Sequence, residues 1–143
     1  MYRFKSLCAL ALLGLSAQGF SENCGQLHIL ISNHTSNDCT LVAQTVIHGS
    51  LESGISIPTH IDAKTDAKAF IMSQMGYGPD ILLTYQCGEG KKITFESQQD
   101  ACYYKAGEIK ATLLDASNMD GFSQVQSGDL SGKAGIVSWI FED

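Results

Sequence analysis

The chain has 143 residues and a mass of 15.4 kDa, with 44% hydrophobic and 17% charged residues. This composition is typical of one globular domain and excludes a disordered or fibrous chain. The formal net charge is −6, and the first five residues hold Lys5 and the chain's one arginine, Arg3. The remaining chain carries seven lysines against 15 acidic residues. Nucleic-acid binding requires clustered Lys and Arg, so we expect no nucleic acid partner.

The N-terminus predicts a cleaved signal peptide over residues 1–19. The two basic residues precede an apolar run of nine, LCALALLGL at Leu7–Leu15, and small residues follow at Ala17 and Gly19. This order is typical of a secretory signal. A membrane anchor is the alternative, but a spanning helix needs about 20 apolar residues. We therefore expect residues 20–143 to form a single exported domain, either secreted or periplasmic.

The cysteines support export. Cys8 lies in the predicted signal, which leaves Cys24, Cys39, Cys87 and Cys102. An even number of cysteines in a small exported domain favours two disulfides. A zinc site is the alternative, but zinc sites commonly use closely spaced pairs, and these four are at least 15 residues apart.

From residue 27 onward, apolar and polar residues alternate in short runs separated by turn residues, which is the pattern of half-buried strands. The turn at Gly88-Glu89-Gly90 marks the clearest hairpin. No stretch has a sustained 3.6-residue period. About eight strands without helices between them predict an all-β fold, an antiparallel β-sandwich stapled by disulfides. In chain order, the expected strands cover residues 27–31, 40–48, 67–75, 81–87, 93–97, 109–113, 123–126 and 136–141.

The expected strands also predict the disulfide pairing. Cys39 follows the first turn and Cys87 precedes the glycine turn, so each lies near a hairpin tip, whereas Cys24 and Cys102 lie near the open strand ends. Strands rise about 3.3 Å per residue, so tip and open end are roughly 20 Å apart, while bridged Cα atoms lie within about 7 Å. If both tips share one end of the sandwich, the pairs are Cys39–Cys87 and Cys24–Cys102.

No motif predicts catalysis, a metal site or a cofactor. The four histidines have no Cys, His or carboxylate neighbours at ligand spacing. The segment Asn118–Gly121 lacks the first Asp and the last Glu of a calcium loop, and Ser131-Gly132-Lys133 lacks the first glycine of a phosphate-binding loop. We therefore expect a protein that binds a partner, with no enzymatic activity, metal or cofactor.

One segment resembles a known family. Residues 80–104 read DILLTYQCGEGKKITFESQQDACYY, which combines a strand with Leu-x-Tyr, a glycine turn, a strand ending in Phe-x-Ser and a loop with paired tyrosines. This arrangement resembles the central hairpin of the actinoporins, which are sea-anemone cytolysins. The fungal and bacterial aegerolysins have a similar sandwich. The resemblance implies a compact β-sandwich that recognises membrane lipid headgroups.

The resemblance also implies a site. In the actinoporins the loop after Phe-x-Ser contributes to a phosphocholine site, and by position this points to Ser97, Tyr103 and Tyr104 as ligand-binding residues. A quaternary ammonium group binds aromatic faces, and a hydroxyl group can bind phosphate. The alternative is that both tyrosines cover the edge of the core. Only Phe20–Gln26 separates the predicted signal from Leu27, which is too short for the family's pore-forming helix, so we expect no pore formation by this protein alone.

Two functions therefore remain open. The first is a secreted effector or toxin-like module that recognises a host lipid headgroup or glycan, and it predicts affinity for liposomes of a defined headgroup. The second is an exported protein–protein interaction or periplasmic accessory domain, and it predicts a retained protein partner instead.

Overall fold

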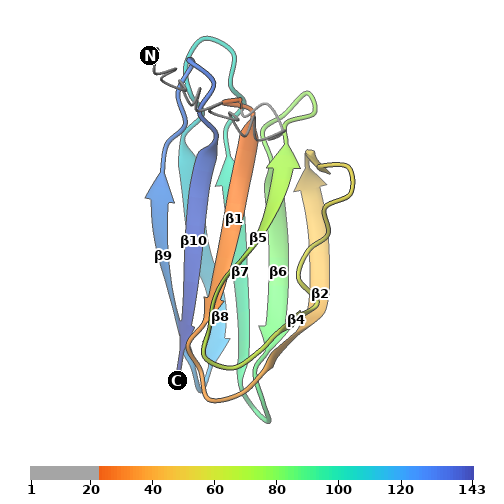
Figure 1. The fold of residues 1–143 in the computed structure, drawn as a ribbon, viewed down its shortest axis with the longest axis vertical. Helices are drawn as coiled ribbons and strands as arrows, with labels where there is room; N and C mark the ends of the chain where they lie inside the picture. The colour runs from red at the N-terminus through yellow and green to blue at the C-terminus, as the bar shows by residue number, and fades with distance from the viewer. Residues whose placement is uncertain (1–22) are drawn as a thin grey trace, which may run out of the picture.

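A computed structural model describes residues 23–143, which form two five-stranded sheets packed face to face (Figure 1). Sheet A has the strand order β3-β5-β1-β10-β9, and sheet B has the order β4-β2-β6-β7-β8. The predicted β-sandwich is confirmed, and the predicted signal peptide lies outside the described residues. The strands are β1 (Gln26–Asn33), β2 (Cys39–His48), β3 (Ser50–Leu51), β4 (His60–Ile61), β5 (Thr65–Ser73), β6 (Asp80–Gln86), β7 (Lys92–Gln99), β8 (Ile109–Ser117), β9 (Asp120–Gln126) and β10 (Gly135–Glu142).

All eight expected strands are present, and β3 and β4 are additional. Each of these two strands has two residues, which is too short to show an alternating pattern. No helix within residues 23–143 is long and apolar enough to cross a membrane.

The core lies between the sheets and consists of the alternate, inward-facing residues of the central strands. The indole ring of Trp139 lies against Phe95, with ring centroids 4.6 Å apart, so the two sheets meet through aromatic contacts. Apolar side chains of this size supply most of the stabilising burial in a small domain. The largest fully buried residues are Trp139, Tyr85, Phe70, Phe95, Phe141, Leu27, Ile29, Ile31, Ile61, Met72, Ile81 and Leu83.

One neighbouring pair of strands is parallel. β1 and β10 run in the same direction at the centre of sheet A, in a register that pairs Leu27 with Gly135, whereas the other neighbouring strands are antiparallel. Side-chain alternation is the same for parallel and antiparallel strands, so the sequence pattern does not reveal the direction.

Both predicted disulfides are confirmed. Cys39–Cys87 joins β2 to the end of β6, with Cα atoms 4.1 Å apart, and Cys24–Cys102 joins the start of the described chain to the β7–β8 loop, with Cα atoms 5.7 Å apart. The β1–β2 and β6–β7 turns lie at the same end of the sandwich, as the prediction assumed (Figure 1). Two disulfides fit an exported, non-cytoplasmic protein.

Candidate functional site

The structure separates Ser97 from the two tyrosines. Ser97 faces the core with 1% of its surface exposed, and its Oγ accepts a hydrogen bond of 2.9 Å from Nε1 of Trp139. Because Trp139 belongs to the other sheet, this bond joins the two sheets. Phe95 is buried two residues earlier on the same strand, so the alternation already placed Ser97 on the inner face. The candidate surface therefore does not include Ser97.

We expect Ser97→Ala to lower the free energy of unfolding by about 1–3 kcal/mol, because the buried indole N–H of Trp139 loses its acceptor. Urea denaturation measures this change. Ser117→Ala, at the exposed end of β8 in the same sheet, is the matched control and should change stability by less than about 0.5 kcal/mol. Weaker ligand binding by an equally stable Ser97→Ala protein would restore Ser97 to the site.

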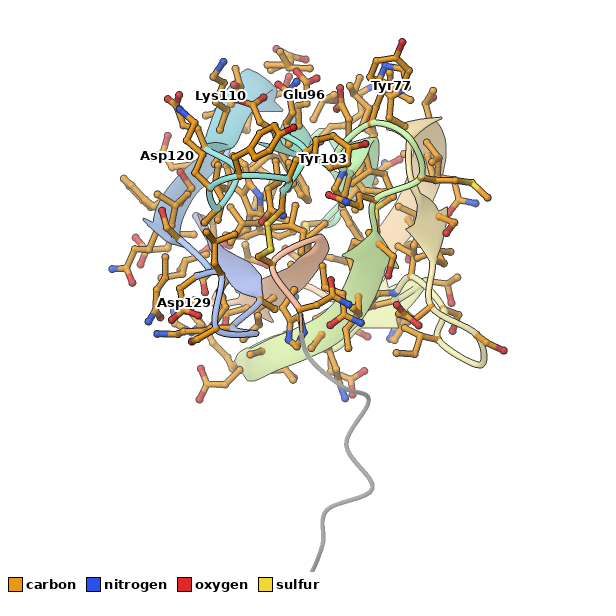
Figure 2. All side chains as sticks on the ribbon, turned by 90° about the horizontal axis from the view of Figure 1, so that it is seen from above. Tyr77, Glu96, Tyr103, Lys110, Asp120 and Asp129 are labelled. Carbon is orange, nitrogen blue, oxygen red and sulfur yellow. A yellow bond between two sulfur atoms is a disulfide. The ribbon has the colours of Figure 1, made fainter. Side chains whose placement is uncertain are left out.

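Tyr103 and Tyr104 lie on the surface, 63% and 96% exposed. The hydroxyl of Tyr103 donates a hydrogen bond of 2.8 Å to the carbonyl oxygen of Gly76 in the β5–β6 loop. That loop carries two more exposed side chains, Met75 at 70% and Tyr77 at 67%. Figure 2 shows Tyr77 and Tyr103 at the same end of the sandwich. We call Met75, Tyr77, Tyr103 and Tyr104 the tyrosine tip.

A third segment contributes to this end of the molecule. The ring of Tyr77 stacks on His48 at the end of β2, with centroids 4.8 Å apart and an angle of 29° between the planes. Sequence reasoning missed His48, Met75 and Tyr77, because they are far from Tyr103 along the chain. The run Met-Gly-Tyr-Gly-Pro over residues 75–79 was a usable signal, since a turn rarely carries two large apolar side chains without a role.

Contacts that do not involve the tyrosines hold the two loops of the tip together. The backbone N–H of Cys102 donates to Oε1 of Gln74 at 2.8 Å, and Nε2 of Gln74 donates back to the Cys102 carbonyl oxygen at 3.3 Å. A Cβ atom on Gly78 would lie 1.8 Å from the carbonyl oxygen of Gln99, so only glycine permits this close approach. The disulfide at Cys102 adds a covalent tie. The loops are thus positioned before any ligand binds.

The base of the tyrosine tip is acidic. Asp80 begins β6 directly after the β5–β6 loop, pairs with His48 in the sheet register, and is 6% exposed. Its Oδ1 atom is buried with no hydrogen-bond partner among residues 23–143. Burial raises the pKa of Glu96, and a hydrogen bond to Asp80 and charge repulsion from it raise this pKa further. These causes favour the protonated, uncharged form of Glu96, so the pair is a weaker source of negative charge than two free carboxylates.

A second polar cluster lies at the opposite end, where β2 begins (Figure 1). Nε2 of His60 is 3.4 Å from Oδ2 of Asp38 and 3.0 Å from Oδ1 of Asp62. Within the described residues this is the group of side chains that could hold a metal ion, and all three are exposed. The same imidazole nitrogen faces both carboxylates, so a metal ion would have to displace these contacts.

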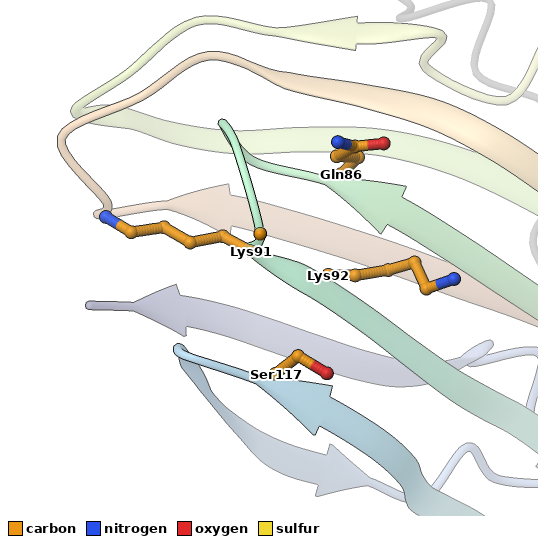
Figure 3. Close-up of a pocket in the computed structure, with 5 residues that line it drawn as sticks. Gln86, Lys91, Lys92 and Ser117 are labelled. Carbon is orange, nitrogen blue, oxygen red and sulfur yellow. The ribbon is translucent and has the colours of Figure 1, made fainter.

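Two shallow hollows lie elsewhere on the described surface. Figure 3 shows the first, of about 290 Å³, near the β6–β7 turn, where the side chains of Lys91 and Lys92 point in opposite directions. Nζ of Lys91 is 2.8 Å from Oδ2 of Asp143, so its charge is already paired. The two ammonium groups therefore do not converge on an anion site. The second hollow, of about 310 Å³, is lined by Leu41, Val42, Ala43, Gln44 and Thr59.

No protein-family model matches the chain, and no curated protein matches it in sequence. Solved structures do match its fold. The lipid-binding protein Nakanori has a TM-score of 0.67 at 8% identity over 90% of this chain and 74% of Nakanori. The RahU protein, solved with a TRIS molecule, has a TM-score of 0.60 at 10% identity over 84% of this chain and 96% of RahU. IP-1A from Alcaligenes faecalis has a TM-score of 0.54 at 12% identity over 84% of this chain and 93% of IP-1A.

These likenesses establish the fold. At such low identity they do not carry a ligand or a site across, because one fold supports many functions. This β-sandwich is one that a lipid-binding protein also uses.

Proposed function

We propose that this protein is a secreted, non-catalytic binding module, and that its tyrosine tip recognises a membrane lipid headgroup that carries a quaternary ammonium group. One observation carries the proposal. Four large apolar or aromatic side chains, each at least 63% exposed, are gathered on two loops that a disulfide and hydrogen bonds hold in place. A cluster of this kind on a rigid scaffold marks a binding surface.

The chemistry of the tip favours this ligand class. Tyrosine rings attract a quaternary ammonium group through their electron-rich faces, and tyrosine also suits the membrane–water boundary. Lys105 is exposed in the same loop as Tyr104 and supplies a partner for phosphate. Without the predicted signal peptide the net charge is −8, from seven lysines and 15 acidic residues, which opposes binding to anionic bilayers, so the preferred surface is zwitterionic.

Two further points support the proposal. The fold is shared with a lipid-binding protein, and residues 80–104 resemble the central hairpin of the actinoporins, a family that binds phosphocholine headgroups. The proposal therefore includes a secreted effector or toxin-like role that stops at recognition of the host surface.

Vesicle flotation tests the proposal. The purified exported chain, with both disulfides formed, should float with phosphatidylcholine or sphingomyelin vesicles and stay in solution with phosphatidylethanolamine or phosphatidylglycerol vesicles. Moderate salt should leave the binding unchanged, since the contact does not depend on long-range charge. Equal binding to all four lipids, or binding only to a glycan array, would exclude the quaternary ammonium headgroup. Release of an entrapped dye would contradict the absence of pore formation.

The double substitution Tyr103→Ala with Tyr104→Ala should weaken vesicle binding by roughly ten-fold to several hundred-fold, because each cation–π contact contributes about 0.5–2 kcal/mol. The matched control is Leu114→Ala, which removes a 49% exposed apolar side chain on β8 and should bind like the wild type. Circular dichroism checks that both variants fold. If the double variant unfolds, the tyrosines stabilise the core edge and the proposed site is wrong.

A further inference from the structure

The outer faces of the two sheets differ in chemistry. The outer face of sheet B follows the usual rule for a solvated antiparallel sheet, in which the residues that point away from the core are polar. Thr84 and Thr94 are opposite one another in the register, with their hydroxyl oxygens 2.9 Å apart. Glu96 and Lys110 also lie on this face, and Figure 2 shows both side chains on the same side of the sandwich.

The outer face of sheet A is largely apolar over three rows of the register, which hold one histidine and no acidic residue. Acidic residues border the rows on the β5 side. The backbone N–H of Glu52 donates to the carbonyl oxygen of Ile71, and Asp66 lies at the β5 bulge opposite Ser32, where it pairs with His34. On β9 and β10, charged residues occur beyond the third row, where Glu142 lies opposite Asp120 in the register. We call these eleven positions the sheet A face. The rows are Ile71–His28–Ile136–Gln126, Ala69–Leu30–Ser138–Gln124 and Ser32–Ile140–Phe122.

The sequence of the central strands fits a sheet that is covered on both sides. β10 reads GIVSWIFE, in which five of the six residues from Ile136 to Phe141 are apolar, and β1 reads QLHILISN, with an apolar run at Ile29–Ile31. The run in β10 has the composition of a strand buried on both faces, whereas strands with one solvated face alternate strictly. Sheet B covers one side of sheet A, and residues 23–143 form no third layer over the other side (Figure 1). Phe122 is consequently 53% exposed.

We propose that the sheet A face is covered by the same face of a second copy of this chain, so that the protein is a two-fold symmetric dimer. Without the predicted signal peptide each chain carries seven lysines against 15 acidic residues, a net charge of −8, and two copies therefore repel each other unless they meet through an uncharged surface. The sheet A face is such a surface. An apolar, uncharged face is also self-complementary, which a two-fold interface requires because both copies contribute the same residues.

The size of the face is sufficient for a specific but moderate dimer. Four strands at about 4.8 Å spacing and three rows about 6.6 Å apart cover roughly 380 Å² per copy in flat projection. Side chains on a pleated sheet expose more area than the projection, so two copies bury about 1,000 Å², which is the lower limit of specific interfaces. We therefore expect a dissociation constant in the micromolar range.

The second copy fits this face better than a membrane does. The face lacks the interfacial tyrosines and the basic residues that attach proteins to bilayers, and the tyrosine tip lies at the end of the sandwich instead (Figure 2). Face-to-face packing of the two copies leaves both tips free. The dimer would then present two tips, and simultaneous binding would raise the apparent affinity for any surface that bears repeated ligands.

Sedimentation equilibrium of the disulfide-bonded chain over a wide concentration range tests the dimer. The wild type should show a monomer–dimer equilibrium. Ser138→Glu places a negative charge in the middle row of the face, and in a dimer two such charges oppose each other. We expect the dissociation constant to rise at least ~100-fold. The matched control is Thr84→Glu, at an outward-facing position in the middle of sheet B, and it should dimerise like the wild type.

The other outcomes each decide against the proposal. A monomeric wild type at every concentration, or a dimer that Ser138→Glu leaves intact, would show that the face is not the interface. A monomeric wild type whose vesicle binding is lost in Ser138→Glu would assign the face to lipid. If Ser138→Glu does not fold, Phe122→Lys on the edge strand β9 replaces it, because a side chain that is 53% exposed tolerates a charge when the protein is monomeric.

Discussion

Replacing both Cys24 and Cys102 by serine should lower the free energy of unfolding by about 4.5 kcal/mol and should also weaken vesicle binding. The stability change follows from chain entropy, because the bridge closes a sequence separation of 78 residues in the unfolded chain. The loss of binding follows from the structure, since this bridge holds the loop that carries Tyr103 and Tyr104. Urea denaturation and flotation on phosphatidylcholine vesicles measure the two effects.

The second disulfide is a matched control for the first. Cys39–Cys87 closes a separation of 48 residues, and its removal should cost a similar amount, about 4.1 kcal/mol. It lies at the end of the sandwich opposite the tyrosine tip, so the folded Cys39→Ser/Cys87→Ser variant should bind vesicles like the wild type. Equal binding losses in both variants would show that the tip depends on global stability alone, and no loss in either would show that the bridge does not position the loop.

Trp139→Ala should lower the free energy of unfolding by about 3–5 kcal/mol. Trp139 is 1% exposed at the centre of the core, so its removal leaves a large cavity between the sheets and leaves the hydroxyl of Ser97 without its donor. Chemical denaturation measures the change. The variant also removes the ring that packs on Phe95 at 4.6 Å.

Trp139→Phe separates the two parts of this effect. It keeps most of the buried volume and removes the indole N–H, so it should cost less than Trp139→Ala. A double-mutant cycle between Trp139→Phe and Ser97→Ala isolates the energy of the hydrogen bond that joins the sheets. Additive effects in this cycle would mean that the bond contributes nothing to stability.

The tyrosine tip could be predicted only in part. Tyr103 and Tyr104 follow Cys102 directly in the sequence, but the sequence left open whether they form a surface site or cover the edge of the core, and the structure shows both side chains exposed. Tyr77 and His48 come from two other segments, and only the packing of the β5–β6 loop against the β7–β8 loop brings them to the same end. The resemblance to the actinoporins pointed to Ser97 as a site residue, but in the structure Ser97 is buried in the core and accepts a hydrogen bond from Trp139. Side-chain contacts across the sandwich depend on which strands face each other, and a linear pattern does not contain this information.

The sequence by itself determined eight of the ten strands and the sandwich class, because alternation with a period of two and the position of turns are local properties of the chain. The disulfide pairing followed only with the assumption that both hairpin tips lie at one end of the sandwich, which the structure confirms. Only the tertiary structure decided the order of the strands, the parallel pairing of β1 with β10, and the contrast between the two outer faces. Alternation shows that a strand has two sides, but it does not show which strands lie side by side. The sheet A face exists because β5, β1, β10 and β9 are neighbours, and contacts between residues far apart in the chain decide that arrangement.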